Sequence, residues 1–248
     1  MMTKMTDLRI KLFADGADLA AVRRLASEPH IKGFTTNPTL MRKSAVQDYA
    51  AFAQEFVTIV PDRHISFEVF SDEADEMESQ ALEIASWGPN VYVKIPVTNT
   101  RSEFMGPLLR RLVTQRVQVN ATAILTLDQV RQVADCLSPT VASCVSVFAG
   151  RIADTGRDPM PIMAESVRIV QALPSTEIIW ASPRELLNIF QAEQIGCHII
   201  TATADVLGKL KYVGKDLAEF SLDTVKMFHA DAVAAGYSIV TRARAQRV

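Results

Sequence analysis

The sequence has few of the residues that build disulfide frameworks or metal centres. It contains 3 cysteines in 248 residues, and this odd number is spread over Cys136, Cys144 and Cys197, each in an apolar context. We therefore expect buried thiols in a reducing cytoplasm and no disulfide framework. The 4 histidines show neither HxH nor HxxxH spacing, so no metal site is expected.

Net charge and long hydrophobic runs are also scarce. The formal net charge is −2, which argues against a nucleic-acid partner and against binding to a membrane surface. No apolar run approaches the roughly 18 residues of a membrane span, and an N-terminus that carries Lys4, Asp7 and Arg9 is not a signal peptide. A cytoplasmic protein is therefore expected. The basic tail Arg242–Arg247 is expected to be a solvated terminus.

What the sequence does contain is a large apolar fraction, 48% of its residues, without a linker-like or low-complexity segment. Short apolar runs alternate with segments of helical period, which predicts a single domain over residues 1–248. The expected strands are Ile10–Ala14, Gly33–Thr36, Ile65–Phe70, Val91–Pro96, Val117–Ala121, Val141–Phe148, Ile178–Ala181 and His198–Thr201. Strict alternation indicates an α/β fold, a single (β/α)8 TIM barrel. A doubly wound open sheet is the alternative, but the chain has neither a GxGxxG in its first unit nor a P-loop.

Helix boundaries are marked by periodicity and by capping residues. Amphipathic spacing predicts helices over Val46–Ile59, Glu73–Trp87 and Asp128–Leu137. Capping boxes are expected at Thr126–Gln129 and at Ser182–Glu185, where Pro183 would take the first helical position. An extra pair of C-terminal helices over Lys215–Ala235 is expected outside the barrel, packed either on it or on another subunit.

One lysine, Lys94, lies in the middle of the β-branched and aromatic run Val91–Val97. Desolvating an ammonium group costs several kcal/mol unless the group is paired or neutralised. Burial lowers a lysine pKa and frees an amine nucleophile for Schiff-base chemistry. The strand by itself favours a lysine that snorkels to water or one held in a buried ion pair, so the remaining residues decide between these interpretations and a reactive amine.

Polar residues also stand at the ends of the other expected strands, where a barrel carries its active site. They are Asp15, Thr35, Thr36, Asn37, Glu68, Asn120, Thr122, Ser146, Ser182, Thr201 and Thr203. Taken singly, Asn37 and Ser182 fit helix N-caps, and Asp15 fits a turn. Glu68 is flanked by apolar residues on the strand next to that of Lys94, and together they would form a coupled acid/base pair. The set predicts one polar mouth.

Two arginines predict an anion site at the same mouth. Arg151 follows the sixth strand, and Arg184 follows the seventh at the start of the helix expected there. Guanidinium groups beside a helix N-terminus suit a phosphate, and barrels commonly bind phosphate near strands seven and eight. Outside the context of a barrel, both arginines would fit surface ion pairs as well.

These motifs occur in one order over nearly the whole chain, and with them the sequence resembles the transaldolase family. The matching segments are Phe13–Asp15, Phe34–Thr39, Phe67–Val69, Val93–Pro96, Asn120–Thr122, Ser146–Ile152 and Ala181–Arg184. They include a TTNP element, the strand lysine and an SxFxGR element. Jointly these elements are far more specific than any one of them.

The resemblance implies catalytic roles for four residues. Lys94 would form the Schiff base with a ketose donor, and Asp15 would take the proton from the sugar hydroxyl during carbon–carbon cleavage. Glu68 would dehydrate the carbinolamine through a water molecule that Thr122 helps to hold. The iminium is an electron sink, so the carbanion left by cleavage would be stabilised while the first product leaves.

The resemblance also implies a set of substrate-binding residues. They are Thr35, Asn37, Asn120, Ser146, Phe148, Arg151, Ser182 and Arg184. Asn37 and Asn120 would position the dihydroxyacetone unit. The phosphate would lie on Arg151, Ser182 and Arg184. No metal and no organic cofactor is implied, and the partners would be small sugar phosphates, with the chain in a homo-oligomer.

The family contains a transaldolase branch and a fructose-6-phosphate aldolase branch, and two residues favour the first. The aldolases tend to carry Gln in place of Glu68 and Tyr in place of Phe148. The chain is therefore expected to move a dihydroxyacetone unit from a ketose phosphate, such as fructose 6-phosphate or sedoheptulose 7-phosphate, to an aldose phosphate. Val147 and Pro183 stand where transaldolases often have Pro and Phe, which leaves a sulfonated or non-phosphorylated sugar open. An aldolase that releases free dihydroxyacetone and a barrel that only binds sugar phosphates are the two competing interpretations.

Overall fold

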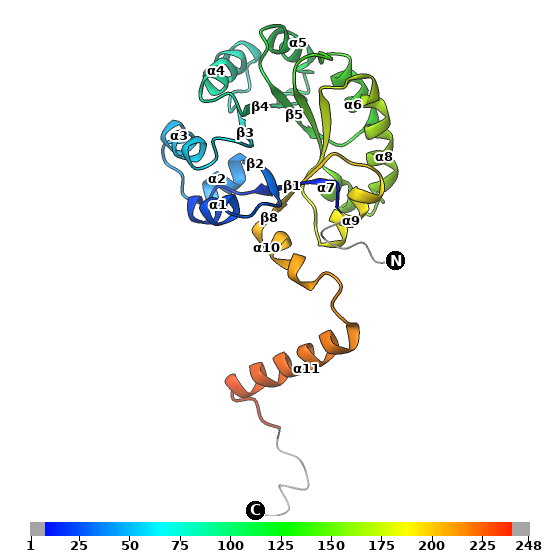
Figure 1. Cartoon of the computed structure of the whole chain (residues 1–248). Helices are drawn as coiled ribbons and strands as arrows, with labels where there is room; N and C mark the ends of the chain where they lie inside the picture. Colours follow the sequence, from blue (N-terminus) through cyan, green and yellow to red (C-terminus); the bar gives the residue numbers. More distant parts are fainter. Residues whose placement is uncertain (1–7, 240–248) are drawn as a thin grey trace, which may run out of the picture.

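The computed structural model describes residues 8–239 and contains a closed barrel of parallel strands (Figure 1). The strands follow one another in chain order: β1 (Lys11–Asp15), β2 (Ile31–Thr35), β3 (His64–Glu68), β4 (Val91–Pro96), β5 (Val119–Ile124), β6 (Ser143–Val147), β7 (Thr176–Trp180) and β8 (Ile199–Thr203). β8 pairs with β1 and closes the barrel. The expected (β/α)8 fold is confirmed. Strand ends are shifted by a few residues, most in β5, which ends at Ile124 instead of Ala121.

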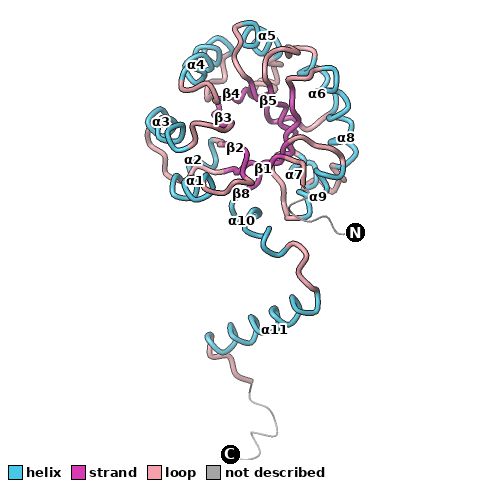
Figure 2. Tube along the Cα trace, in the orientation of Figure 1, coloured by secondary structure: helices cyan, strands magenta, loops and turns pink. Residues whose placement is uncertain are grey.

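Helices surround the strands (Figure 2). They are α1 (Leu19–Ala26), α2 (Pro38–Lys43), α3 (Tyr49–Ile59), α4 (Ala74–Ser86), α5 (Gly106–Thr114), α6 (Leu127–Ala134), α7 (Ala149–Ala153), α8 (Met160–Ile169), α9 (Leu187–Gln194) and α10 (Ala204–Leu207). Each amphipathic helix turns an apolar stripe towards the sheet, as α4 does with Met77, Ala81 and Ile84. The apolar core between the strands and this ring of helices holds the strands in position. It thereby fixes the strand ends and the polar residues that they carry.

Side chains are packed inside the barrel, as is typical of this fold. Phe13, Cys144 and Ile179 form a second apolar cluster inside the ring of strands. Gly33 faces the Phe13 ring, and a Cβ at this position would lie 2.5 Å from it, so only glycine leaves room for the phenyl group. All three cysteines are buried and free, as expected.

The structure contains one of the two expected capping boxes, and the prediction of the other was wrong. Thr126 and Gln129 cap α6 reciprocally. No helix begins at Pro183, because Ser182 has a left-handed φ of 61° instead of the extended conformation of an N-cap. The Asn188 side chain instead accepts hydrogen bonds from the backbone of Arg184 (2.7 Å) and of Glu185 (3.1 Å). α9 therefore starts later, at Leu187.

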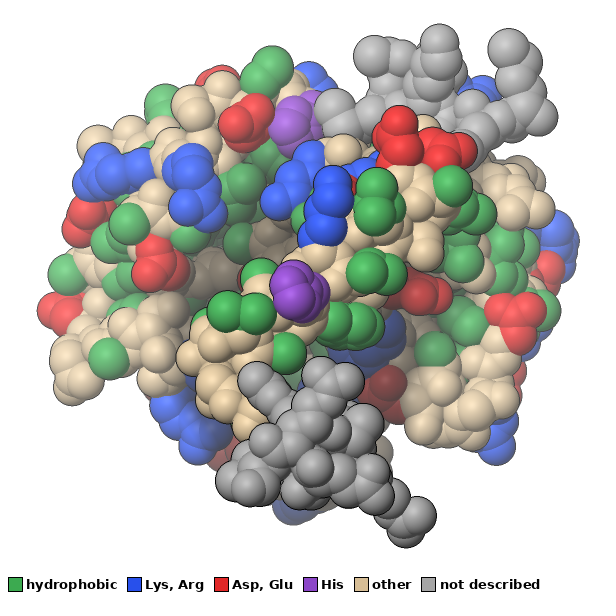
Figure 3. Space-filling view, turned by 90° about the horizontal axis from the view of Figure 1, so that it is seen from below, with side chains coloured by type: hydrophobic (Ala, Val, Ile, Leu, Met, Phe, Trp, Pro, Cys, Tyr) green, Lys and Arg blue, Asp and Glu red, His purple; other side chains and the backbone are tan. Residues whose placement is uncertain are grey.

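The expected pair of C-terminal helices is a single helix, α11 (Leu217–Ala234), which Figures 1 and 2 show apart from the barrel. A 3-10 segment, η3 (Gly208–Tyr212), precedes it. None of its residues is buried, so it does not pack on the barrel of its own chain. Its exposed hydrophobic residues include Leu217, Leu222, Val225, Met227 and Phe228, and hydrophobic side chains are visible along this part of the surface in Figure 3. The homo-oligomer stays a prediction.

Two further expectations concern the surroundings of the protein. The basic tail from Arg242 lies outside the described residues. Among the helices of residues 8–239, none combines the length and the hydropathy needed to cross a membrane.

Candidate active site

A cavity of about 440 Å³ opens at the C-terminal ends of the strands, where the barrel mouth was expected. Of the catalytic and substrate-binding residues that the resemblance implies, only Asn120 does not line it. Among the other polar residues at the strand ends, Thr201 lines it, whereas Thr36 and Thr203 do not. The strands bring together side chains up to 186 residues apart in the chain, from Asp15 on β1 to Thr201 on β8. The polar mouth predicted from the strand ends is thus present.

Lys94 and Glu68 form a buried ion pair at this mouth. They are register partners on β3 and β4, and Lys94 Nζ lies 2.8 Å from Glu68 Oε2. Nζ also donates a hydrogen bond to the Thr36 carbonyl at 2.7 Å. The exposed fraction of the Lys94 side chain is 7%, which rules out a lysine that snorkels to water. The carboxylate is close enough to exchange a proton with the amine.

Asp15 faces the same cavity from β1. Thr35 Oγ1 donates a hydrogen bond to its Oδ1 at 2.8 Å, and Asn37 Nδ2 lies 3.5 Å from its Oδ2. Burial raises the pKa of the Asp15 carboxyl above its ordinary value, while the positive charge of Lys94 and these hydrogen bonds oppose the rise. The same Thr35 hydroxyl is 2.5 Å from Thr201 Oγ1, which fixes its direction.

Thr122 lines the cavity and carries a hydroxyl without a hydrogen-bond partner in the described part of the chain. Its Oγ1 is buried and has no hydrogen bond within residues 8–239. The register of β5 shifts next to it, and Ala123 takes a left-handed φ of 61°. Bulges of this kind often redirect side chains beside active sites. An unpaired buried hydroxyl beside a polar cavity is a suitable place for an ordered water molecule.

Asn120 lies beneath the cavity in a chain of buried hydrogen bonds. Ser146 Oγ, which lines the cavity, donates to Asn120 Oδ1 at 2.7 Å, and Asn120 Nδ2 donates to Ser66 Oγ at 3.0 Å. Ser66 Oγ is also 2.6 Å from His64 Nε2. Burial lowers the pKa of His64 to about 3, so the imidazole is neutral at pH 7. This series of hydrogen bonds holds the Asn120 amide in one orientation.

Asn37 serves two purposes. Its Oδ1 accepts a hydrogen bond from the backbone of Leu40 at 3.0 Å, which makes it the N-cap of α2. Its amide nitrogen points to Asp15 and lines the cavity. The N-cap interpretation and the binding-site interpretation are therefore compatible, because the two ends of one amide make different contacts.

The two predicted arginines meet at one side of the cavity, but without the helix N-terminus expected beside Arg184. Arg184 Nη1 donates to Ser182 Oγ at 2.9 Å, and its Nε lies 2.8 Å from Asp154 Oδ1. The guanidinium holds the pKa of Asp154 below its ordinary value. Gly150 lets the loops approach, since a Cβ there would lie 1.6 Å from the Ser182 carbonyl oxygen.

Two residues of this region were not predicted. Asp154 lies three residues after Arg151, about one helical turn, so helical spacing was a usable signal for a carboxylate near the anion site. Lys43, at the end of α2, also lines the cavity, and nothing in its sequence context distinguishes it from a surface lysine. Within the described residues, neither Lys43 nor Arg151 forms an ion pair, and both residues line the cavity.

The described part of the chain holds no group of three or more His, Cys, Asp or Glu side chains placed to bind a metal ion. The barrel and its mouth thus define the class: a (β/α)8 protein whose site is centred on a lysine paired with a carboxylate. The family described as transaldolase/fructose-6-phosphate aldolase matches residues 12–239, and the chain belongs to this family.

Curated relatives agree with this assignment. The chain is 33% identical over 199 residues to a probable transaldolase of Dehalococcoides mccartyi, and 35% identical over 199 residues to one of Roseiflexus castenholzii. Both alignments cover 80% of this chain and 88% of the relative. A probable transaldolase 2 of Listeria monocytogenes is 31% identical over 202 residues, which are 81% of this chain and 88% of that protein.

Among solved structures, the chain is similar to KGPDC from Streptococcus mutans. The TM-score is 0.56 at 11% sequence identity, and the alignment covers 83% of this chain and 99% of that one. A second structure of that protein, solved as a ligand complex, gives a TM-score of 0.53 at 12% identity, over 79% of this chain and 88% of that one. At this identity the likeness concerns the barrel fold alone.

Proposed function

We propose that the chain is a transaldolase that transfers a dihydroxyacetone unit from a ketose phosphate to an aldose phosphate through a Schiff base on Lys94. The observation that carries the proposal is the ion pair between Lys94 and Glu68, with 2.8 Å between Nζ and Oε2, at the mouth of the barrel. Fructose 6-phosphate and sedoheptulose 7-phosphate are the donors that this reaction would use.

The first half of the reaction makes the iminium. Lys94 gives a proton to Glu68, and the neutral amine adds to the ketose carbonyl to form a carbinolamine. Glu68 then returns a proton, through a water molecule on the Thr122 hydroxyl, to the carbinolamine oxygen, which leaves as water. The unpaired buried Oγ1 of Thr122 supports this position for the water.

The second half breaks and remakes a carbon–carbon bond. Asp15 takes the proton of the hydroxyl group next to the scissile bond, the bond breaks, and its electron pair moves into the iminium to give an enamine. The aldehyde product leaves, and the enamine attacks the carbonyl carbon of the acceptor while Asp15 returns the proton. Water then releases the new ketose from Lys94. The Asn37 amide beside Asp15 and the Ser146 hydroxyl, which donates to Asn120, would bind the three-carbon unit.

The distal phosphate would lie between Arg151, Ser182 and Arg184. Asp154 pairs with Arg184 and orients its guanidinium group, while Arg151 and Lys43 also line the cavity and have no ion-pair partner within residues 8–239. This arrangement supports binding of a phosphate or of a sulfonate, because both are tetrahedral anions. The positive charges favour either anion over an uncharged group at the distal end of the sugar.

The test of the proposed function is the dependence of donor cleavage on an acceptor. With fructose 6-phosphate alone, the enzyme is expected to retain the three-carbon unit and to release little free dihydroxyacetone. Adding an aldose phosphate is expected to restore turnover, measured as formation of the new ketose. Rapid release of free dihydroxyacetone without an acceptor would instead identify an aldolase. A panel of phosphorylated, sulfonated and neutral ketoses identifies the terminal group, and binding without turnover of any of them would identify a sugar-phosphate binder.

Asp15 makes the pH dependence of cleavage predictable. It works as a base, so it must be ionised, and burial raises its pKa above the ordinary value of 3.8. Activity is therefore expected to fall as the pH drops through this raised pKa. The Thr35 hydrogen bond lowers the Asp15 pKa, so Thr35→Val is expected to move the acid limb to higher pH. The kcat–pH profiles of both proteins measure this, and a limb that stays in place or moves to lower pH contradicts the role of Asp15.

A further inference from the structure

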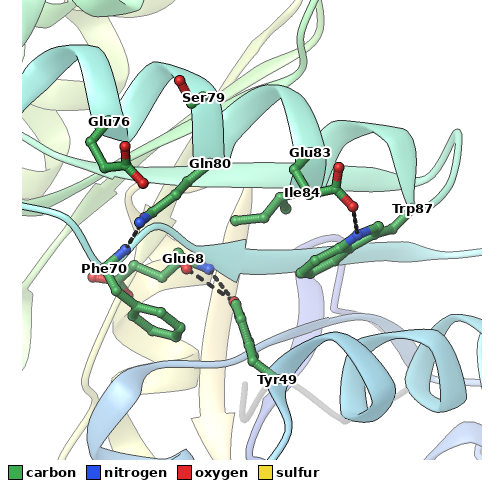
Figure 4. Close-up of a pocket in the computed structure, with 9 residues that line it drawn as sticks. All are labelled: Tyr49, Glu68, Phe70, Glu76, Ser79, Gln80, Glu83, Ile84 and Trp87. Atoms are coloured by element: carbon green, nitrogen blue, oxygen red, sulfur yellow. Dashed lines mark hydrogen bonds between the residues drawn. The ribbon is translucent and has the colours of Figure 1, made fainter.

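The backbone of Glu68 is held by a side chain from outside the barrel. Tyr49, the first residue of α3, donates its hydroxyl hydrogen to the Glu68 carbonyl at 3.0 Å, and its oxygen accepts a hydrogen bond from the Glu68 N–H at 2.9 Å (Figure 4). Burial raises the pKa of Tyr49, so the hydroxyl keeps the proton that it donates. One hydroxyl thus satisfies both backbone groups of this residue.

The sheet itself does not supply hydrogen-bond partners for the Glu68 backbone. The ladder between β2 and β3 ends at the pair Thr35 and Ser66, with a last bond from the Thr36 N–H to the Ser66 carbonyl. One step further, the Glu68 N–H would need the Thr36 carbonyl, but that carbonyl accepts from Lys94 Nζ. The Glu68 carbonyl would need the N–H of Pro38, and proline has none. The Tyr49 hydroxyl therefore replaces the missing part of the ladder.

Aromatic packing fixes the position of this hydroxyl. The Tyr49 ring lies 6.1 Å from Phe67, 4.5 Å from Phe70 and 5.5 Å from Trp87, centroid to centroid. Tyr49 also follows directly on Asp48, whose side chain caps α3 and fixes the start of the helix. The Tyr49 backbone is thus fixed at the start of α3, and its ring is held by the aromatic side chains around it.

We propose that Tyr49 is a positioning residue for the carboxylate of Glu68: its hydroxyl fixes the Glu68 backbone where the ladder ends, and this keeps the carboxylate in reach of Lys94. The inference rests on the proposed function, because it assigns Tyr49 to the proton transfers of imine formation. Tyr49 lies on the outer side of β3 and acts only through Glu68.

The first test is Tyr49→Phe, which removes the hydroxyl and keeps the ring. Because small displacements of a reacting group cost up to roughly 10²-fold in rate, kcat is expected to fall about tenfold. KM for the donor is expected to change less than twofold, because Asn37, Ser146 and Arg151 are untouched. The matched control is Tyr212→Phe, which alters a partly exposed tyrosine of η3 and is expected to leave both constants unchanged.

The second test separates positioning from a general loss of packing. In a Glu68→Gln background the proton-transferring carboxylate is already absent, so adding Tyr49→Phe is expected to slow imine formation by less than a further twofold. Single-turnover trapping with borohydride measures this rate in all four proteins. If the rate reductions caused by the two substitutions multiply instead, Tyr49 acts by another route and the inference is overturned.

The third test uses the cavity of about 390 Å³ that opens beside the Tyr49 ring, lined by Phe70, Ile84 and Trp87 (Figure 4). Tyr49→Ala joins the space of the lost ring to this cavity, which gives phenol a way in. Phenol is expected to restore at least part of the rate, and toluene is not. Equal rescue by toluene would mean that only packing matters and overturns the inference.

Failure of the positioning role of Tyr49 can be distinguished from failure of the proposed function. If Tyr49→Ala does not fold, the result with Tyr49→Phe decides. If the unsubstituted protein traps no ketose at all, the proposed function is wrong. If it traps the ketose normally and Tyr49→Phe traps it at the same rate, only the positioning role of Tyr49 is wrong.

Discussion

Replacing Lys94 with methionine is expected to lower transfer activity by roughly 10⁴-fold or more, because the step that makes the covalent intermediate loses its nucleophile. Methionine has a similar length and no charge, so it keeps most of the volume of the side chain and removes the nucleophile. The activity is measured as formation of the new ketose from fructose 6-phosphate and an aldose phosphate.

The control for this substitution is a lysine in a nearby strand of the same barrel. Lys32 on β2 is exposed, and its Nζ donates to the Pro29 carbonyl at 2.7 Å on the outside of the barrel. Lys32→Met is expected to retain full activity. Circular dichroism establishes that Lys94→Met is folded, which matters because the change leaves the carboxylate of Glu68 without its partner. A folded Lys94→Met protein with near-normal turnover would exclude the Schiff base on this residue.

Replacing Glu68 with glutamine is expected to slow imine formation and hydrolysis by about 10²-fold, the usual contribution of a general acid/base. The amide keeps the shape of the side chain but cannot carry a proton between Lys94 and the carbinolamine. Binding of the donor is expected to change little, since the residues around Arg151 are distant from this step. Pre-steady-state kinetics of the first turnover measure the two rates separately.

A second ion pair of the barrel supplies the control for Glu68. Lys11 and Glu177 lie at the opposite, N-terminal ends of their strands, also with 2.8 Å between Nζ and a carboxylate oxygen. Glu177→Gln removes the charge of a pair with the same spacing, more exposed and away from the mouth, and is expected to leave the kinetics unchanged. If Glu68→Gln and Glu177→Gln behave alike, Glu68 has no role in proton transfer.

Much of the barrel and most of its mouth follow from local patterns in the sequence. Apolar runs of strand length that alternate with amphipathic helices specify a parallel barrel, and the fold then brings the strand ends together. The pairing of Glu68 with Lys94 required only that the third and fourth strands be neighbours in register. These features depend on periodicity and on chain order, both of which can be read from the sequence.

The errors concern features that depend on backbone conformation or on contacts between distant loops. Ser182 has the sequence of an N-cap, but the close approach of its carbonyl to Gly150 accompanies a left-handed conformation, and α9 begins later. Tyr49 was not predicted because its role arises where a strand ladder ends, at Pro38. The pair of Arg184 and Asp154 joins two loops 30 residues apart, which periodicity does not reveal.

The measurement that tests the central claim most directly is reduction with borohydride in the presence of fructose 6-phosphate, followed by peptide mass spectrometry. The proposed mechanism predicts one stable adduct with the mass of the reduced three-carbon or six-carbon imine, located on Lys94. The adduct is expected to be absent in Lys94→Met and present in Lys32→Met. An active protein that yields no adduct, or one whose adduct lies on another lysine such as Lys43, would contradict the mechanism.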